Sequence, residues 1–427
     1  MRNLKDRLKD IDKKEIQRKW EKLDADPELS TKEKLDRLVR LNLKREHGPA
    51  KERSEVPASA PAPTGPFVVR DFFYSLNDPY RKVRLAQWRQ VEPKTLALLA
   101  GDERFLQVDP TKLLFFDTET TGIAGGTGTL PFMLGFGFLA GDSFQVRIFV
   151  LKDLNREGEF LEAVDRFLDE NGFSALVTFN GRAFDLPLME TRYILQHMRC
   201  PMLRLPHLDF LFPARTIWRN TYDSRRLGYL GEMLLGISRS DDIDPSEIPA
   251  LYFSYLRSNE FTLLESVIEH NSLDLVGLSA VVLLGARYLE DYSLTSDEGE
   301  ILGLGILYER AGWIERASDF YRIARENSSR DGVFSQAVKR LSVILKKQKL
   351  YGEAIDLWRI LSEHNDADAF RELSVHYEHR ERKYQDALEV VEMAFERLDL
   401  TEGRRQELEK RLQRLRIKIA RSQAEEL

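Results

Sequence analysis

Residues 112–122 read KLLFFDTETTG, an apolar run that ends in two carboxylates. Residues two apart in a strand share one face, so Asp117 and Glu119 should project from the same side as Leu113 and Phe115. Two negative charges this close repel each other unless a cation lies between them, and a divalent ion with hard oxygen ligands commonly fills that place. Acidic residues after a strand are also frequent turn formers. On this stretch alone, a metal site and a turn explain the two carboxylates equally well.

The bulk properties of the 427-residue chain indicate a soluble protein of two or three domains, with 42% hydrophobic and 31% charged residues. The longest apolar run, residues 130–140, is too short to cross a bilayer, and the charged N-terminus is unlike a signal peptide. One cysteine, Cys200, leaves no partner for an internal disulfide and no thiolate cluster for zinc. We therefore expect a cytoplasmic protein that does not contact membranes.

The first 66 residues contain too few apolar side chains for a core. Residues 1–47 are predicted to form a charged helical segment, and residues 48–66, rich in Pro, Ala and Ser, a linker. Residues 1–53 hold 17 basic and 12 acidic residues, whereas the whole chain carries a net charge of −6. A solvated helix, a segment that orders on a partner and a basic nucleic-acid arm all fit this composition.

Residues 67–292 are predicted to form one α/β domain. After a preamble through Leu106, we expect strands at 112–118, 131–139, 144–151, 175–179 and 201–211, and helices at 157–170, 186–198 and 261–288. The second and third strands should form a hairpin. This order predicts a mixed sheet with flanking helices.

The glycine-rich loop at residues 122–128, GIAGGTG, does not have the pattern of a nucleotide-binding loop. It lacks the Gly-Lys-Ser/Thr ending of a Walker loop, and it leads into a strand, so no helix N-terminus is available to bind phosphates. We expect a turn that lets the backbone pass close to the carboxylate pair or to its substrate.

A third carboxylate, Asp185, lies between a predicted strand and a predicted helix. Because Leu186 and Pro187 follow it, Asp185 would also serve as a helix N-cap, a role that requires no catalytic explanation. Asp209, beside His207 on the last predicted strand, is an alternative acidic candidate.

A fourth carboxylate lies on the helix predicted at residues 261–288. Helical spacing places His270 and Asp274 one turn apart on an otherwise apolar stripe that includes Val267 and Leu278. A buried carboxylate without a partner costs several kcal/mol, so Asp274 requires a cation nearby. A histidine on such a face can be a core residue or a functional one.

These motifs resemble the DEDD group of 3′-to-5′ exonucleases in the ribonuclease H-like superfamily, over about residues 110–290. Within that group, the chain looks most like the bacterial YprB-like branch, which also carries a helical-repeat tail. The resemblance makes Asp117 and Glu119 of FFDTETTG the first motif and Asp185 of FNGRAFD the second. Asp274 of HNSLD is the third motif, with His270 as the base.

The resemblance implies a hydrolase in which the four carboxylates hold two magnesium or manganese ions. His270 would accept the proton of the attacking water. Histidine-type members of the group usually have four residues between the histidine and the aspartate, whereas tyrosine-type members have three. This chain has a histidine at the tyrosine spacing, so the base is the point at which it departs from the pattern.

Residues near the motifs are candidates for substrate binding. The set comprises Thr118, Thr120, Gly122, Asn180, Arg182 and Phe184. Further candidates for phosphate contacts are Arg215, Arg219, Arg225 and Arg226. Phe184 and Trp218 could stack on a terminal base. Taken singly, a surface arginine or a core aromatic is the more ordinary role for each of them.

Residues 293–427 are predicted to form a helical-repeat domain. The matching positions are Leu304, Tyr308, Ala317 and Tyr321, then Leu341, Leu345, Ala354 and Trp358, then Leu373, Tyr377, Ala387 and Val391. This regularity resembles tetratricopeptide-type helix pairs and predicts a short solenoid of about three units with a charged capping helix at 402–427. Such arrays usually bind a protein partner, although this one could also simply pack on the first domain.

Two functions compete. The first is a metal-dependent exonuclease acting on the 3′ end of single-stranded RNA or DNA. The second is an inactive nuclease-like fold that serves as a binding platform through its repeats. The presence of all four carboxylates favours the first, because a metal site that lacks one ligand is usually too weak to work.

Overall fold

The computed structural model describes residues 65–122, 128–237 and 243–425. Contacts divide the chain into two units, residues 1–62 and 63–427, and the described residues all belong to the second. The predicted helical segment at 1–47, nearly all of the linker at 48–66 and most of the glycine-rich loop lie outside the described residues.

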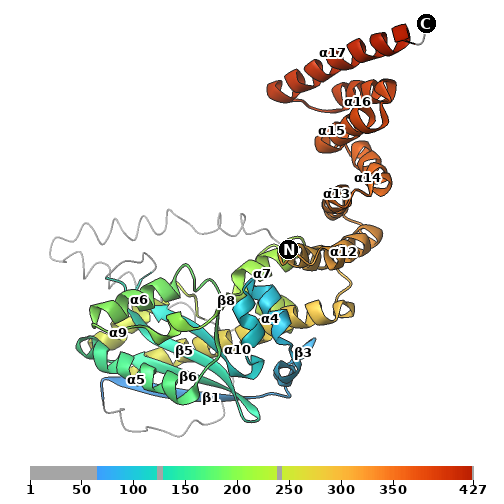
Figure 1. Ribbon diagram of the computed structural model, residues 1–427. Coiled ribbons are helices and arrows are strands. Elements are labelled where there is room, and N and C mark those ends of the chain that lie inside the picture. The colour runs from blue at the N-terminus through green and yellow to red at the C-terminus, as the bar shows by residue number, and fades with distance from the viewer. Residues whose placement is uncertain (1–64, 123–127, 238–242, 426–427) are drawn as a thin grey trace, which may run out of the picture. The chain divides into compact units, whose positions relative to one another are not determined.

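A six-stranded mixed sheet lies at the centre of the α/β region, residues 67–290 (Figure 1), in the order β1-β6-β5-β4-β7-β8. The strands are β1 Phe67–Ser75, β4 Leu113–Thr120, β5 Pro131–Ala140, β6 Ser143–Leu151, β7 Ala175–Thr178 and β8 His207–Asp209. A separate two-stranded sheet pairs β2 Pro79–Tyr80 with β3 Val83–Arg84. Strands β1, β6, β5 and β4 are antiparallel neighbours, whereas β7 runs parallel to β4 and β8 parallel to β7. The predicted mixed sheet is confirmed.

Two strands differ from the prediction. The sequence prediction did not include β1. Its side chains are mostly half-buried or exposed along the sheet edge, so its apolar pattern is weak, and its pairing with β6 defines it as a strand. The strand predicted at 201–211 is wrong over most of its length. Pro201 starts a 3₁₀ turn that ends at Arg204, and Pro206 directly precedes the three residues of β8. Proline cannot donate to a strand ladder, which leaves room only for a short strand.

The α-helices of the α/β region cover both faces of the sheet. They are α4 Pro93–Ala100, α5 Glu157–Asn171, α6 Asp185–Leu195, α7 Leu211–Ile217, α8 Leu227–Leu230, α9 Ile248–Ser258 and α10 Glu265–Glu290. Alternation along β4 sends Leu113 and Phe115 into a core shared with α10, whereas Leu114 and Phe116 join a second core with α5 and α6.

The long helix α10 is the central element of the larger core. It packs against β4, β5 and β6. Within the described ranges, Phe261–Glu290 is the one segment long and apolar enough to cross a membrane, and 83% of its most apolar window is buried inside the protein. Such burial is expected of the core helix of a soluble fold, which passes the same test of length and composition.

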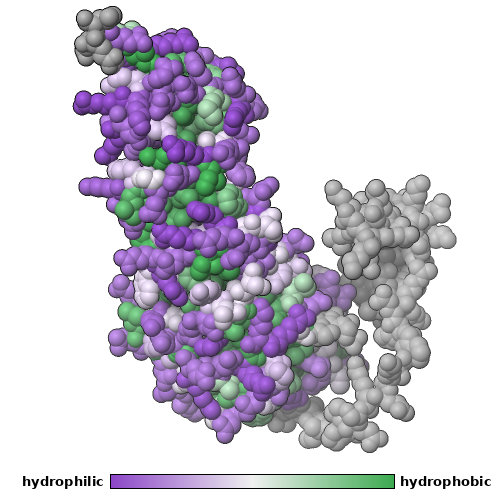
Figure 2. Space-filling model, turned by 90° about the vertical axis from the view of Figure 1, so that its right-hand side faces the viewer, coloured by the Kyte–Doolittle hydropathy of each residue, from purple (hydrophilic) through white to green (hydrophobic). Residues whose placement is uncertain are grey.

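Seven helices follow the α/β region. They are α11 Glu298–Arg310, α12 Ile314–Asn327, α13 Asp331–Lys347, α14 Tyr351–Glu363, α15 Ala367–His376, α16 Tyr384–Arg397 and α17 Glu402–Glu425. Each packs against the next along the chain. All the repeat positions predicted from the sequence are buried. The surface in Figure 2 is mostly hydrophilic over these helices, with apolar side chains gathered in bands, as expected where helices bury their apolar faces against each other.

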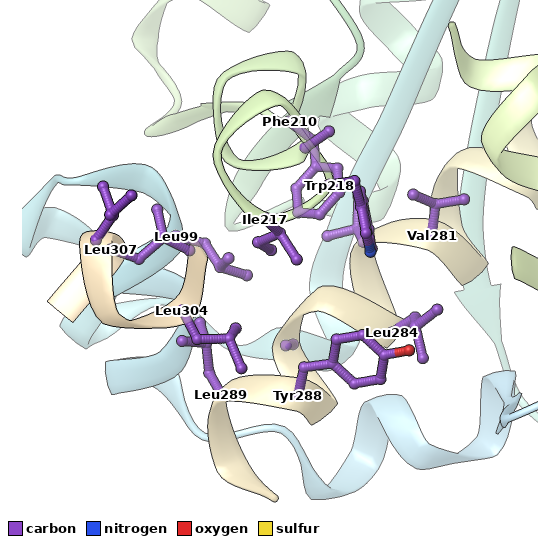
Figure 3. Packing of buried hydrophobic residues seen from close by; sticks show 14 of the residues in the cluster. Leu99, Phe210, Ile217, Trp218, Val281, Leu284, Tyr288, Leu289, Leu304 and Leu307 are labelled. Carbon is purple, nitrogen blue, oxygen red and sulfur yellow. The ribbon is translucent and has the colours of Figure 1, made fainter. Parts of the chain in front are cut away.

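Helix α11 packs on the α/β region as well as on α12. Figure 3 shows Ile217 and Trp218 at the end of α7 meeting Val281 and Leu284 of α10, beside Leu304 of α11. A Cβ added at Gly303 of α11 would lie 2.5 Å from the carbonyl oxygen of Thr216, so α11 and α7 touch backbone to backbone. The domain boundary at residue 293 stays a prediction, but the first helix beyond it covers the core before it.

The position of Trp218 corrects one sequence interpretation. Its side chain is 0% exposed, and its ring lies 6.0 Å from that of Phe210 in an edge-to-face contact. Trp218 therefore cannot stack on a nucleic-acid base. Its apolar bulk stabilises the joint between α7 and α10.

Candidate active site

Asp117 and Glu119 lie at the end of β4, on the face of the sheet that α10 covers. In the register with β5, Asp117 is opposite Gly135 and Glu119 is opposite Met133. The strand pairing becomes irregular between Glu119 and Thr120. Irregular pairing of this kind is common beside active sites, because it redirects side chains away from the ladder. The two carboxylates thus share one space at the end of the strand.

Two helices bring the other predicted residues toward this space. His270 and Asp274 lie one turn apart on α10, which packs on β4. Asp185 is the first residue of α6. The N-cap residue of this helix is Phe184, whose side chain makes no capping hydrogen bond. The interpretation of Asp185 as an N-cap is therefore wrong. Its Oδ1 instead accepts a hydrogen bond of 2.6 Å from the hydroxyl of Thr118, across from β4.

The electrostatics of the site show that the four carboxylates interact. Burial raises the pKa of Asp117 well above its usual range, and the charges of Asp185, Glu119 and Asp274 raise it further. Burial also raises the pKa of Glu119 to about 7, and neighbouring His270 opposes that rise. The pKa of Asp185 is raised to about 6, again mainly by burial. The protein therefore concentrates negative charge at a place where charge is unfavourable.

Asn271 belongs to the site, although sequence reasoning did not single it out. Its Nδ2 donates to Oδ2 of Asp117 at 2.8 Å, and its amide also favours the charged form of Glu119. The side chain is fully buried against Gly135, where an added Cβ would lie 1.9 Å from Asn271 Oδ1. That Oδ1 atom is buried and has no hydrogen-bond partner among the described residues. The signal in the sequence was an amide beside His270 on a buried helix, together with a glycine inside the apolar strand β5.

His270 is buried next to the acidic group. Its Nε2 lies 3.3 Å from Oδ2 of Asp274, the residue one helical turn further along α10. His270 also interacts with Glu119, because its charge lowers the pKa of that carboxyl. The histidine therefore lies against Asp274 and interacts electrostatically with Glu119.

A cleft of about 590 Å³ opens over Asp117 and Asp185, and we call it the carboxylate cleft. It is lined by Asp117, Thr118, Thr120, Gly122, Thr129, Phe179, Asn180, Ala183, Phe184, Asp185, Pro187, Leu188 and Thr191. Five of the six residues predicted to bind substrate are in this lining. The sixth, Arg182, is not. Phe184 is 58% exposed, so its ring is free to meet a ligand in the cleft.

Arg182 lies outside the lining because of how its loop is held. Oδ1 of Asp209 accepts a hydrogen bond of 2.7 Å from the backbone N–H of Asn180, and its Oδ2 accepts one of 3.0 Å from that of Arg182. Asp209 thus ties β8 to the loop that precedes α6. The guanidinium of Arg182 lies 5.7 Å from the ring centre of Phe212, on α7. Asp209 positions the loop, and Arg182 points toward α7.

Comparison with known proteins agrees with this fold. Residues 114–284 match the model of a family described as RNase_H superfamily. A relative from Bacillus subtilis (strain 168) is 31% identical over 315 residues, which are 72% of this chain and 75% of the relative. The chain belongs to the RNase_H superfamily. The relative's name, "Uncharacterized protein YprB", states no activity.

Members of the ribonuclease H superfamily generally hydrolyse phosphodiester bonds, and the matched segment contains all four carboxylates, Asn271 and His270. The family therefore indicates a protein that processes nucleic acid. RNase H-like nucleases typically use divalent metal ions, for which acidic residues such as those at the end of β4 are the usual ligands.

The residues at the site fit divalent metal ions in donor type and charge. Within the described ranges, no three Asp, Glu, His or Cys side chains already stand as a metal-binding group. Asp117 is turned to Asn271, Asp185 to Thr118 and Asp274 to His270. Carboxylate oxygens are the ligands that magnesium and manganese prefer, and a cation among them would offset the burial and the repulsion that raise their pKa values.

Proposed function

We propose that this protein is a metal-dependent 3′-to-5′ exonuclease that hydrolyses phosphodiester bonds at single-stranded nucleic-acid ends. The observation that carries the proposal is the convergence of Asp117, Glu119, Asp185 and Asp274, from one strand and two helices, on one partly buried acidic site. A fold gains no stability from four neighbouring carboxylates by themselves, because their burial and repulsion favour the protonated forms.

The carboxylates would hold two magnesium or manganese ions, which supply charge stabilisation at the phosphate and activate the attacking water. Asn271 would keep Asp117 in a fixed orientation through its 2.8 Å hydrogen bond. Thr118 would do the same for Asp185. The exposed ring of Phe184 gives a terminal base a surface on which to stack within the carboxylate cleft.

His270 would act as the general base. Its place beside Glu119 and Asp274 supports this role, because a base must lie within reach of the water that attacks the phosphate. The acidic surroundings would stabilise the imidazolium formed when the ring accepts a proton.

A second candidate function is a binding platform built on an inactive nuclease fold. The exposed apolar side chains Trp313, Val343, Leu350 and Ile417 of the helical region favour it, since solenoids often bind a protein partner. In that case the acidic site would have no catalytic role, and added metal would not cause the protein to hydrolyse nucleic acid.

The two functions separate in one experiment. Purified full-length protein is incubated with single-stranded RNA and DNA oligonucleotides labelled at the 5′ end, with magnesium, manganese or a chelator. An exonuclease produces a ladder that shortens from the unlabelled 3′ end only when metal is present. Intact oligonucleotide in every lane, under conditions where the protein binds metal, would leave the platform as the better explanation.

A further inference from the structure

A second cleft, of about 420 Å³, lies where α7 meets the first helices of the repeat region. It is lined by Phe212, Arg215, Thr216, Arg219, Asn220, Arg225, Ile306, Arg310, Gln336 and Arg340. We call it the arginine cleft. Five of its residues are arginines and none is acidic, so it presents a concentrated positive charge. Three of the arginines come from the α/β region, and Arg310 and Arg340 come from α11 and α13.

Most of this positive charge is not balanced within the protein. Arg215 and Arg219 are both exposed and line the same cleft, and they form no ion pair with any residue in the described ranges. Among the described residues, the side chain of Arg310 donates to the hydroxyl of Thr216, at 2.9 Å, and to no carboxylate. Arg340 is the exception, because it pairs with Glu309 at 2.7 Å. Its Nε atom is nevertheless buried with no hydrogen-bond partner.

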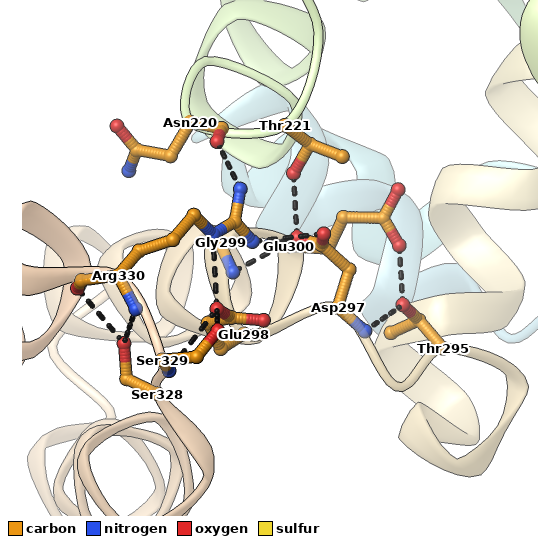
Figure 4. A network of polar contacts seen from close by, with 10 residues as sticks. All are labelled: Asn220, Thr221, Thr295, Asp297, Glu298, Gly299, Glu300, Ser328, Ser329 and Arg330. Atoms are coloured by element: carbon orange, nitrogen blue, oxygen red, sulfur yellow. Dashed lines mark hydrogen bonds and ion pairs between the residues drawn. The ribbon is translucent and has the colours of Figure 1, made fainter.

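The two walls of the arginine cleft are fixed to each other. Figure 4 shows Arg330 at the centre of a polar network: its guanidinium donates to Asp297, at 2.8 Å, to Glu298, at 2.9 Å, and to the carbonyl oxygen of Asn220. Asp297 in turn accepts from the hydroxyl of Thr221. Together with the backbone contact of α11 on α7, this network holds the arginines of both regions around one space.

The arginine cleft is connected to the carboxylate cleft through one stacked pair. Phe212 lines the arginine cleft, is 49% exposed and carries the guanidinium of Arg182 over its ring. On either side of Arg182 in the sequence, Asn180, Ala183 and Phe184 line the carboxylate cleft. A positive residue and two exposed rings therefore bridge the acidic site and the basic one.

We infer that the arginine cleft binds the phosphate backbone of the nucleic-acid strand upstream of the 3′ end held in the carboxylate cleft. The inference rests on the proposed function and extends it: the repeat region supplies part of the substrate-binding surface. A polyanion with planar bases suits the arrangement, because guanidinium groups bind phosphates and exposed phenylalanines stack on bases. An acidic protein segment would use the arginines but would have no need of the aromatic bridge.

Binding without catalysis tests this inference. Full-length protein is titrated with fluorescein-labelled oligothymidylates of 3 and 12 nucleotides in a chelator, over a range of salt concentrations. The double variant Arg215→Gln/Arg219→Gln should bind the 12-mer about tenfold or more weakly. The slope of its log affinity against log salt concentration should be shallower by about 1.4, the value for two lost phosphate contacts on a single strand. Because both side chains are exposed and make no ion pairs, their removal should leave the melting temperature unchanged.

The matched control is Arg199→Gln/Arg204→Gln, which removes the same charge from two exposed arginines that precede β8, whereas α7 follows the other end of that strand. It should behave as wild type, and Arg215→Lys/Arg219→Lys should keep most of the salt dependence. An unchanged salt slope in the Arg215/Arg219 glutamine variant, or equal weakening in the control, would overturn the inference. Competition by polyglutamate at the same charge concentration as effectively as by oligothymidylate would assign the cleft to an acidic protein instead.

The outcome is separable from that of the proposed function. If wild type hydrolyses the 12-mer with metal but the salt slope is unaffected by Arg215 and Arg219, the exonuclease stands and the arginine cleft is not on the substrate path. If the slope changes as expected but no metal supports hydrolysis, the cleft binds nucleic acid and the exonuclease proposal fails.

Discussion

The carboxylate cleft and the arginine cleft lie on either side of Arg182, and they hold opposite charges in opposite ways. Asp185 is buried and the other three carboxylates are half-buried, and burial together with the neighbouring negative charges raises the pKa of Asp117, whereas Arg215 and Arg219 stand exposed in solvent. Buried like charges destabilise a fold until a counter-ion joins them, but solvated charges cost little. Metal binding at the acidic site should therefore affect both the stability of the fold and hydrolysis. Changes at the basic site should affect only nucleic-acid binding.

The largest expected effect is at the metal ligands. Asp117→Asn and Asp274→Asn should each remove hydrolysis, because each takes away one anionic ligand of the proposed metal pair. In a chelator, both variants should melt at a temperature equal to or a few degrees above wild type, since about 1 kcal/mol of repulsion relieved corresponds to such a shift. Hydrolysis at the wild-type rate in either variant would contradict the assignment.

His270→Ala should lower turnover by about 10² to 10⁴, the range typical of a lost general base, with metal affinity and melting temperature little changed. Single-turnover hydrolysis and thermal unfolding are the two measurements. A variant that turns over normally and melts early would show that His270 only packs inside the helix.

Asn271→Ala should weaken metal binding by roughly 10- to 100-fold, the usual cost of removing a group that orients a ligand. Gly135→Ala is the matched test, because its new Cβ would fall 1.9 Å from Asn271 Oδ1 and displace the amide from Asp117. Isothermal titration with manganese measures both variants. Unchanged metal affinity in Asn271→Ala would mean that the amide fills space and does not orient Asp117.

The smallest expected effect is on the pH dependence of stability without metal. Burial raises the pKa of Glu119 to about 7 and that of Asp185 to about 6. Between pH 5 and 7 the folded protein therefore holds more protons than the unfolded chain, whose carboxyls titrate near pH 4, so stability falls as pH rises. The melting temperature in chelator should decline over this range, and saturating metal should flatten the profile. A rising profile in chelator would contradict the raised pKa values.

Much of this protein could be predicted from local sequence. FFDTETTG places Asp117 and Glu119 on one face because strand alternation is set by the backbone alone. The repeat positions could be read in the same way, because helical periodicity selects which side chains are buried. These features depend on neighbours a few residues away, and the sequence displays those neighbours directly.

Other features depend on partners that are distant in the chain. β1 is defined by its pairing with β6, Asn271 acquires its role from Gly135 and Asp117, and Trp218 is a core residue because α10 lies against it. The arginine cleft exists because α11 and α13 pack beside α7. The sequence by itself determined which residues carry charge and which face of each element they occupy. Only the tertiary structure decided which charges meet, because electrostatic and packing energies depend on distances between side chains that the backbone pattern does not specify.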